Sequence, residues 1–459
     1  MRTHFIGIGG IGMSGIARLL LARGEQVSGS DMTDHPILQG LRRQGARVSI
    51  GHRAGQVHGA DCVIYSSSIA PDNPELSAAR NRRIPVLHRG QAIGRLLRGK
   101  RTIAVAGSHG KSTTTALIAS VLLDAGLDPT VILGAELELL GGNARPGAGR
   151  WAVVETDESD GSFLWLEPEV AVITNMDDEH LDYFRNRTEI RAAYGRFADR
   201  VRPGGLLIGC ADDPAVGRIL AGSNRRRIAY GLSSEAELAA GRLELKPGGS
   251  RFLCLRRGRP AGWVRLRIPG RHNALNGLAA VACAEALGIA FPAVAASLEG
   301  YSGAGRRFQI QGQIGGVMVV EDYAHHPTEI RATLEAARSW PARRIRCVFQ
   351  PHRYSRTRFL LDRFGSCFDS ADELILLPIY AASEEPIAGV TSAALLEAVR
   401  RLGKVPVSCR SAEETLEALA SDSRPGDLIL FLGAGSVGAL ARRFLENLRE
   451  AAHAEPLRA

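Results

Sequence analysis

The segment Thr102–Thr115, TIAVAGSHGKSTTT, constrains the fold more than any other part of the sequence. Its first five residues are apolar or β-branched, which predicts a buried strand. The loop GSHGKST follows at once, and Ala116–Ala125 then predicts a helix with an apolar face. In a strand–loop–helix unit, backbone N–H groups of the loop and the helix N-terminus bind phosphate. The segment therefore predicts a nucleotide-binding P-loop in an α/β fold.

The same loop supplies side chains for nucleotide chemistry. Lys111 is expected to contact the outer phosphates, and the Ser112 hydroxyl to bind Mg2+. Val105 stands where the strict pattern has glycine, so only the GxxGKS portion is present. A tight turn with a solvated lysine is the alternative. Glycine, lysine and two hydroxyls directly after a strand favour nucleotide binding over it.

Length, cysteine usage and charge narrow the class of protein. A chain of 459 residues predicts two to four domains, and no apolar run is long enough for a membrane span. The seven cysteines form no CxxC pair, and the N-terminus lacks a secretory leader pattern, so a cytoplasmic protein is expected. The net charge of +9 comes without a basic tail or interleaved aromatic residues. This pattern favours small polyanionic ligands over nucleic acid.

A second glycine-rich loop, Gly7–Gly12, matches the dinucleotide pattern GxGxxG between a predicted strand and a predicted helix. Asp31 follows about twenty residues later, where such proteins place an acid that binds ribose. An NAD-dependent oxidoreductase is therefore an outside alternative. It is disfavoured because the P-loop supplies another nucleotide chemistry and because GxGxxG recurs at Gly433–Gly438. We interpret the first loop as a phosphate site for a nucleotide-linked substrate and the second as a tight turn.

Two acidic loops follow apolar strands in the central part of the chain. Glu155–Asp160 carries four carboxylates, and Asn175–Asp182 carries further acids with His180. Ligands of open α/β sheets bind at the carboxyl ends of the strands, and Mg2+ prefers oxygen ligands. The loops therefore predict the second part of a metal–phosphate site. A solvated loop is the alternative, above all for Glu158 and Asp160.

Two loops near the C-terminus are basic and aromatic. Tyr323–Pro327 and Gln350–Arg358 each follow a predicted strand, and together they hold three histidines, three arginines and two tyrosines. A basic surface is the alternative. We favour a binding site, because both loops are expected at the same edge of one sheet.

The chain resembles the Mur ligase family over its whole length. Eight motifs occur in the family's order: GIGGIGMSGIA, AGSHGKSTTT, ETDESDGSF, ITNMDDEHLDYF, GRHNALN, GAGRRF, DYAHHPTEI and FQPHRYSRTRF. The resemblance implies an α/β protein of three domains. These are a Rossmann-like UDP-sugar-binding domain (1–98), an ATP-binding P-loop domain with an ATPase-type mixed sheet (99–308), and a Rossmann-like amino-acid-binding domain (309–459).

The resemblance also implies roles for individual residues. The ATP contacts would be Gly107, Ser108, His109, Gly110, Lys111, Ser112, Thr113, His272, Asn276 and Asp322. The UDP-sugar contacts would be Gly9, Gly10, Gly12, Met13, Ser14, Asp31 and Ser67. The amino-acid contacts would be Tyr323, His325, His352, Arg353 and Arg356. Mg2+ would be held by Ser112, Glu155 and His180. The catalytic residues would be Lys111, His180, Arg307, His325 and His352.

Two departures from the family pattern are informative. Serine stands at positions 108 and 112, where threonine is frequent in the family, so a hydroxyl is kept. Some relatives carry a carbamylated lysine after the histidine loop, and this sequence has no lysine between Leu181 and Arg202. The carbamylated lysine is therefore absent, as is expected for the branch of the family that adds L-alanine.

The branch that the motifs resemble most joins L-alanine to UDP-N-acetylmuramate, using ATP and Mg2+, through an acyl phosphate. The resemblance implies small-molecule substrates, no nucleic-acid or membrane partner, and a cytoplasmic monomer or homodimer. A murein tripeptide-recycling ligase of the same family is the alternative, and the PHRYSRTR loop favours the alanine-adding branch. A protein that uses ATP only as a switch is disfavoured, because a switch needs no amino-acid pocket.

Overall fold

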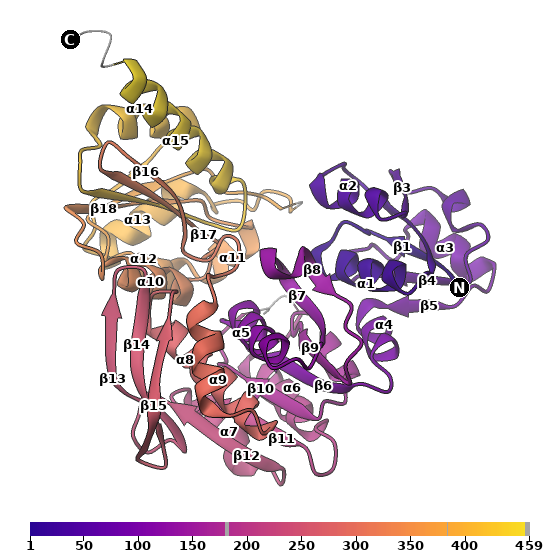
Figure 1. Ribbon diagram of the computed structural model, residues 1–459. Helices are drawn as coiled ribbons and strands as arrows, with labels where there is room; N and C mark the ends of the chain where they lie inside the picture. The colour runs from indigo at the N-terminus through magenta and orange to yellow at the C-terminus, as the bar shows by residue number, and fades with distance from the viewer. Residues whose placement is uncertain (180–182, 383, 455–459) are drawn as a thin grey trace. The chain divides into compact units, whose positions relative to one another are not determined.

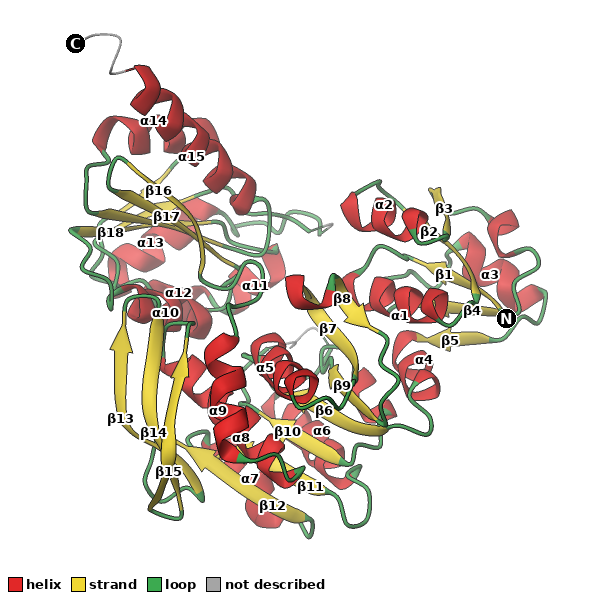
Figure 2. Ribbon diagram, in the orientation of Figure 1, coloured by secondary structure: helices red, strands yellow, loops and turns green. Residues whose placement is uncertain are grey.

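A computed structural model describes residues 1–179, 183–382 and 384–454 of the chain. Figure 1 shows the path of the chain, which forms two compact units. The first unit comprises Met1–Gly241, Leu253–Val264 and Leu275–Gly300, and the second comprises Arg242–Phe252, Arg265–Ala274 and Tyr301–Ala459. Strands and helices alternate along most of the chain (Figure 2).

The N-terminal sheet has five parallel strands in the order β3-β2-β1-β4-β5. Its strands are β1 (Arg2–Ile6), β2 (Gln26–Asp31), β3 (Arg47–Ile50), β4 (Cys62–Tyr65) and β5 (Val86–His88). Its helices are α1 (Ile11–Ala22), α2 (Pro36–Arg43), the 3₁₀ helix η1 (Ala54–Val57), α3 (Pro74–Asn81) and α4 (Arg89–Leu96). The loops after β1 and β4 therefore leave the sheet at the same edge.

The central sheet has ten strands in the order β15-β14-β13-β12-β11-β10-β6-β9-β7-β8. Its strands are β6 (Arg101–Ala106), β7 (Thr130–Leu137), β8 (Gly142–Arg145), β9 (Trp151–Glu155), β10 (Val170–Ile173), β11 (Leu206–Cys210), β12 (Arg226–Gly231), β13 (Leu238–Lys246), β14 (Gly249–Arg256) and β15 (Arg259–Leu266). Neighbours from β7 to β13 pair parallel, whereas β8 pairs antiparallel with β7, so the sheet is mixed. The helices are α5 (Lys111–Asp124), η2 (Glu138–Leu140), η3 (Ser162–Trp165), α6 (Arg187–Asp199), α7 (Pro214–Gly222), α8 (Arg271–Ala286) and α9 (Phe291–Gly300).

The C-terminal sheet has six strands in the order β16-β17-β21-β18-β19-β20, of which only β16 runs antiparallel to its neighbour. Its strands are β16 (Gln309–Ile314), β17 (Val317–Asp322), β18 (Arg344–Phe349), β19 (Glu373–Leu376), β20 (Val407–Cys409) and β21 (Asp427–Leu432). Its helices are α10 (Pro327–Ala337), α11 (Tyr354–Phe359), α12 (Leu361–Gly365), α13 (Ser392–Leu402), α14 (Ala412–Asp422) and α15 (Val437–Ala454). The predicted fold class, α/β with two Rossmann-like domains around a mixed P-loop sheet, is confirmed. The predicted boundaries after residues 98 and 308 stay predictions.

Helix α5 begins earlier than the sequence pattern predicts. It starts at Lys111, directly after the P-loop, instead of at Ala116. Thr113, Thr114 and Thr115 are weak helix formers, but all three are buried in the helix. Tertiary packing of α5 therefore overrides local propensity, and it aims the helix N-terminus at the loop.

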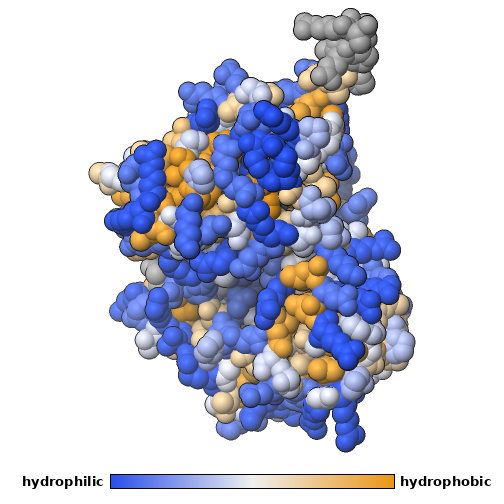
Figure 3. Space-filling model, turned by 90° about the vertical axis from the view of Figure 1, so that its left-hand side faces the viewer, coloured by the Kyte–Doolittle hydropathy of each residue, from blue (hydrophilic) through white to orange (hydrophobic). Residues whose placement is uncertain are grey.

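None of the helices in the described ranges is long and apolar enough to cross a bilayer. On the face that Figure 3 shows, hydrophobic residues form small patches between hydrophilic ones.

Candidate active site

The P-loop glycines are required by close packing and by backbone conformation. Gly107 has φ +141°, and a Cβ there would lie 1.9 Å from Thr174 Oγ1. Gly110 has φ +79° and precedes α5 as its left-handed cap. A Cβ at Gly110 would lie 2.5 Å from Asn276 Oδ1, and Thr114 Oγ1 donates to the same oxygen at 3.2 Å. Asn276, expected near the adenine, thus lies beside the loop.

Lys111 is held inside the loop by oxygen atoms. Its Nζ donates to Gly107 O at 2.5 Å, to Ser108 O at 3.2 Å and to Glu158 Oε1 at 2.7 Å. Burial lowers the pKa of Lys111, but the charges of Glu158, Glu179 and Glu155 and the hydrogen bond to Glu158 together outweigh burial and hold that pKa above its ordinary value. The lysine is therefore a charged donor, and the alternative of a solvated lysine is wrong.

The residues expected to bind Mg2+ fit a hard cation. Ser112 Oγ donates to Glu155 Oε1 at 2.9 Å, and Glu155 Oε2 accepts from Gly134 N at 2.6 Å. A hydroxyl and a carboxylate at the carboxyl end of two neighbouring strands are the oxygen donors that Mg2+ prefers. The third expected ligand, His180, lies outside the described residues.

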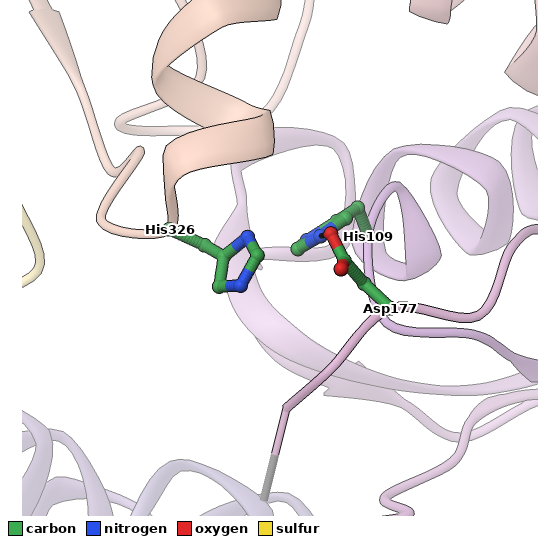
Figure 4. A group of neighbouring side chains, drawn as sticks. All are labelled: His109, Asp177 and His326. Atoms are coloured by element: carbon green, nitrogen blue, oxygen red, sulfur yellow. Dashed lines mark hydrogen bonds and ion pairs between the residues drawn. The ribbon is translucent and has the colours of Figure 1, made fainter. Parts of the chain in front are cut away.

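The loop after β10 packs against the P-loop. His109 N donates to Asn175 Oδ1 at 2.8 Å, and Asn175 Nδ2 and Thr174 Oγ1 both donate to His109 O, at 2.9 and 2.7 Å. Asp177 N donates to Ser108 Oγ at 2.8 Å. His109 Nε2 lies 3.1 Å from Asp177 Oδ2, and Figure 4 shows these two side chains together. Sequence reasoning expected an acidic loop here but missed the positioning roles of Thr174 and Asn175.

The solvated alternative for the first acidic loop is wrong. Glu158 is 2% exposed, and the Asp160 side chain is 8% exposed. Asp160 forms a hydrogen bond with Ser67 Oγ, and Ser67 Oγ also lies 2.8 Å from His88 Nε2. Ser67, expected to contact the UDP-sugar, thus touches the acidic loop of the central sheet.

The first glycine loop is closed by hydrogen bonds to β2. Gly7 N and Ile8 N donate to Ser30 O at 2.9 and 3.0 Å, and Gly9 N donates to Asp31 Oδ2 at 2.8 Å. A Cβ at Gly9 would lie 2.2 Å from His35 Nε2. Asp31 therefore shapes the loop through Gly9.

The start of α1 follows the same loop and carries other expected UDP-sugar contacts. The Met13 and Ser14 side chains are buried. Ser14 Oγ donates to Ile11 O at 3.0 Å and accepts from Asn143 Nδ2 at 3.1 Å. The Met13 side chain is thus taken up by packing, and the Ser14 hydroxyl by hydrogen bonds within the structure.

In the second unit, Asp322 receives two backbone donors. Phe308 N donates to its Oδ2 and Ala324 N to its Oδ1, both at 2.7 Å. Burial raises the pKa of Asp322 to about 6, against the opposing effect of the Arg307 charge. Burial, together with the Arg307 charge, lowers the pKa of His272 to about 4. His272 and Asp322 are thus both buried groups near the Arg307 charge.

Two arginines lie over the ring of Tyr323. The guanidinium carbons of Arg306 and Arg307 lie 4.9 and 5.3 Å from its ring centroid. Arg306 Nε donates to Glu321 Oε1 at 2.7 Å, and its Nη2 donates to Gly433 O at 2.9 Å and to Gly435 O at 3.2 Å. The second GxGxxG loop therefore offers these carbonyls to an arginine, and its glycine Gly433 adopts φ +148°.

The histidines of the basic loops differ in which ring nitrogen is engaged. His325 Nδ1 lies 3.0 Å from Tyr323 O, and a carbonyl only accepts, so this nitrogen carries the proton. His352 Nδ1 lies 3.0 Å from Arg356 Nη1, and a guanidinium only donates, so this nitrogen is the acceptor. Neutral His325 consequently has a free lone pair at Nε2, whereas neutral His352 carries its proton there.

Burial and nearby arginines favour the neutral form of both His325 and His352. Burial, together with the charges of Arg356 and Arg353, lowers the pKa of His352 to about 4. Burial also lowers the pKa of His325 well below its ordinary value, with Glu329 opposing. The His325 and His352 ring centroids lie 6.0 Å apart. Arg353 adopts φ +70° and its side chain is 43% exposed. The structure thus brings all four residues into one basic loop cluster.

Comparison with known families identifies the class of protein. Three family models match in order: the Mur ligase family catalytic domain at residues 2–101, the Mur ligase middle domain at residues 105–284, and the Mur ligase glutamate ligase domain at residues 306–435. The chain belongs to the Mur ligase family, which confirms the resemblance seen in the sequence.

The chain is also similar, over nearly its full length, to individual ligases. A UDP-N-acetylmuramate–L-alanine ligase from Solibacter usitatus is 48% identical over 448 residues, covering 97% of this chain and 95% of the relative. The crystal structure of a UDP-N-acetylmuramate–alanine ligase from Thermotoga maritima superposes with a TM-score of 0.84 at 28% identity, covering 98% and 100% of the two chains. A murein peptide ligase from Psychrobacter arcticus shares the fold, with a TM-score of 0.72 at 22% identity and 98% of each chain covered.

Proposed function

We propose that this protein joins L-alanine to the carboxylate of UDP-N-acetylmuramate in an ATP-dependent reaction of peptidoglycan precursor synthesis. The full-length similarity to the Solibacter usitatus ligase, at 48% identity, carries the proposal. The murein tripeptide-recycling reaction is disfavoured, because the murein peptide ligase from Psychrobacter arcticus is only 22% identical. We expect the enzyme to act in the cytoplasm as a monomer or homodimer.

The P-loop supports the ATP-binding part of the proposal. Phosphoryl transfer needs positioned donors and positive charge around the transferred group. Lys111 is a charged donor inside the loop, and Arg307 would add charge at the γ-phosphate. His272 and Asn276 are proposed contacts of the adenine, and Asp322 of the ribose. Ser112, Glu155 and His180 would hold Mg2+, which neutralises phosphate charge when bound.

The proposed ligation has two steps. The substrate carboxylate attacks the γ-phosphorus, the bond to the bridging oxygen breaks, and ADP leaves with that electron pair. The product is an acyl phosphate. The alanine amine then attacks the acyl carbon, the amide forms and inorganic phosphate departs. The amine must lose a proton first, because an ammonium group has no lone pair for the attack.

His325 is the better placed of the two histidines to accept that proton. Its Nδ1 proton is donated to Tyr323 O, which leaves Nε2 as an acceptor. Its lowered pKa keeps the ring neutral at pH 7. His352 instead orients Arg356 through Nδ1. Arg356 and Arg353 supply planar guanidinium donors that suit the alanine carboxylate, and Tyr323 would line the same pocket.

Phosphate release tests the proposal directly. The enzyme is supplied with ATP, Mg2+ and UDP-N-acetylmuramate, and each amino acid is added in turn. We expect release to require both UDP-N-acetylmuramate and L-alanine, with the amide product found by mass spectrometry. Release that requires murein tripeptide instead would establish the recycling reaction. Release with neither acceptor would contradict ligation.

A further inference from the structure

Arg89 connects the N-terminal sheet to the acidic loop of the central sheet. It is the first residue of α4, and its side chain is 17% exposed. Its Nη2 donates to Asp157 Oδ2 at 2.5 Å and to Asp160 Oδ2 at 2.8 Å, and its Nε donates to Asp160 Oδ2 at 3.2 Å. One guanidinium therefore holds two carboxylates that stand three positions apart in one loop.

The other two carboxylates of that loop contact the P-loop and the start of α5. Glu155 accepts from Ser112 Oγ, and Glu158 accepts from Lys111 Nζ. Asp157 lies between them in sequence and is bound to Arg89. The loop is thus fixed between the P-loop on one side and α4 on the other.

Close backbone packing accompanies the ion pairs. A Cβ at Gly90 would lie 2.7 Å from Ser162 Cβ and 2.9 Å from Trp165 Cδ1, and a Cβ at Gly94 would lie 3.0 Å from Trp165 O. These positions of α4 therefore lie directly against η3, the helix that follows the acidic loop. Such tight contact leaves little freedom in how α4 presents Arg89 to the loop.

Arg89 also lies beside the expected UDP-sugar contacts. A Cβ at Gly12 would lie 3.2 Å from its Nη1. Ser67, after β4, shares the Asp160 carboxylate with Arg89. Both positions belong to the group expected to bind the UDP-sugar. Arg89 therefore contacts the acidic loop and also lies beside expected UDP-sugar contacts.

We propose that Arg89 is a positioning residue for the ligation: it holds the acidic loop so that Glu155 and Glu158 stay against Ser112 and Lys111. The proposed effect of Arg89 on ligation rests on the proposed function, whereas its effect on the position of the acidic loop does not. Without Arg89, Asp157 and Asp160 would be two like charges with no shared cation, and repulsion would move the loop. The loss would then reach the nucleotide site, although Arg89 does not touch it.

Hydrogen exchange and nucleotide binding test this role in Arg89→Gln and Arg89→Lys. The control is Arg95→Gln, which removes an exposed arginine from the last turn of the same helix. In the ligand-free protein, we expect Arg89→Gln to speed amide exchange in peptides covering residues 155–163 by about tenfold, the size of one lost charge-assisted hydrogen bond. Calorimetric titration with Mg2+ and a non-hydrolysable ATP analogue should show a similar loss of affinity. Arg89→Lys should retain part of both, and Arg95→Gln should match wild type.

Each result decides for or against the role. Wild-type exchange and nucleotide affinity in Arg89→Gln would overturn it. A changed affinity for UDP-N-acetylmuramate alone would also overturn it, because Arg89 would then be a substrate ligand. If Arg89→Gln does not fold, Asp157→Asn with Asp160→Asn probes the same contacts from the loop side, with the same expected results. If wild-type enzyme shows no alanine-dependent phosphate release, the ligase proposal fails, but the exchange measurement still decides the role of Arg89.

Discussion

Lys111 and Glu158 form an ion pair inside the P-loop, with Nζ 2.7 Å from Oε1 and side chains that are 16% and 3% exposed. Glu155, in the same acidic loop, accepts from Ser112. The acidic loop thus contacts both Lys111 and the Ser112 hydroxyl and holds them in position.

Lys111→Ala should abolish ATP turnover while the protein stays folded. The lost charge removes the main phosphate donor, whereas the buried Glu158 carboxylate left without Lys111 costs about 3–5 kcal/mol, less than the roughly 5–15 kcal/mol by which a typical protein is stable. Phosphate release and circular dichroism measure the two effects. Lys246→Ala, which removes an exposed lysine, is the control and should behave as wild type. Normal turnover by folded Lys111→Ala would remove the P-loop from the mechanism.

Glu155→Gln should raise the Mg2+ concentration needed for half-maximal activity by about tenfold or more. The neutral amide can still contact Ser112 and Gly134, so the loss isolates the charge that a cation requires. A titration of activity with Mg2+ at saturating ATP measures it. Glu138→Gln, at an exposed position, should leave the titration unchanged. His180→Ala should shift the titration in the same direction. Unchanged titrations for both variants would mean that these loops do not bind the metal.

The central fold was predictable because its signals are local. A β-branched run, glycines with lysine and hydroxyls, and a following helix all lie within Thr102–Thr115. Strand β3 (Arg47–Ile50) was missed, because it lies at the edge of its sheet and is half-buried at one residue only. An edge strand with so little buried surface shows no apolar run and no clear alternation. Helix α2 was missed as well; it is short, begins at Pro36 and contains Gly40.

The contacts of the site were less predictable than its loops. The sequence places four carboxylates after β9 but does not say which of them meets Lys111, because that depends on how the turn Asp157–Gly161 folds back. Arg89 lies in no recognised phosphate or metal motif, and its partners are 68 and 71 positions away. Pairings at such separations are set by tertiary packing, which periodicity and loop patterns do not report.

Glu75→Gln should destabilise the N-terminal sheet. The Glu75 side chain is fully buried, with His4 Nε2 at 2.5 Å, His52 Nδ1 at 2.6 Å and Ser30 Oγ donating at 2.6 Å. An amide in its place leaves at least one buried donor unsatisfied, at a cost of about 1–3 kcal/mol. Hydrogen exchange in β1 and β2 measures this loss within the sheet. Asp72→Asn, at an exposed position nearby, is the control. Unchanged protection in Glu75→Gln would contradict the prediction.

The same carboxyl group predicts how the stability of wild type depends on pH. Burial raises the pKa of Glu75, but hydrogen bonds from His4, Ser30 and His52, together with the charge of His4, outweigh burial and hold that pKa below the ordinary value of 4.5. Its contribution is therefore fully present above pH 4.5 and is lost as the pH falls through the lowered folded-state value. Protection in β1 and β2 should decline over that acidic range in wild type and decline less in Glu75→Gln. Equal acid sensitivity in both proteins would show that other groups set it.

His325→Gln should lower kcat by about a hundredfold or more, the usual contribution of a general base. His352→Gln should act mainly on the KM for alanine, because its Nδ1 orients Arg356. The lowered pKa of His325 keeps its base form at pH 7, so kcat should fall only on the acidic side of the ordinary histidine range, where the ring gains a proton. Steady-state kinetics from pH 5 to 8 at saturating substrates measure this. An unchanged kcat in His325→Gln would exclude it as the base.

The last prediction concerns Arg356 and Arg353, of which at most one is expected to form the bidentate clamp on the alanine carboxylate. Arg356 is oriented by His352, whereas Arg353 is 43% exposed and its Nε lies 4.0 Å from Glu384 Oε1. The held guanidinium loses less freedom on binding, so Arg356 is the expected clamp. Losing a charge-assisted pair costs about 1.5–3 kcal/mol, roughly ten- to a hundredfold in affinity.

Arg356→Lys should therefore raise the KM for alanine by that factor and leave the KM for ATP nearly unchanged, since lysine lacks the planar fork. Arg353→Lys is the matched control from the same loop and should shift the alanine KM less. A larger shift in Arg353→Lys would assign the clamp to Arg353. If both variants keep the wild-type alanine KM, or if both change the ATP KM instead, the carboxylate binds elsewhere, and the loop at His325 and His326 becomes the next segment to test.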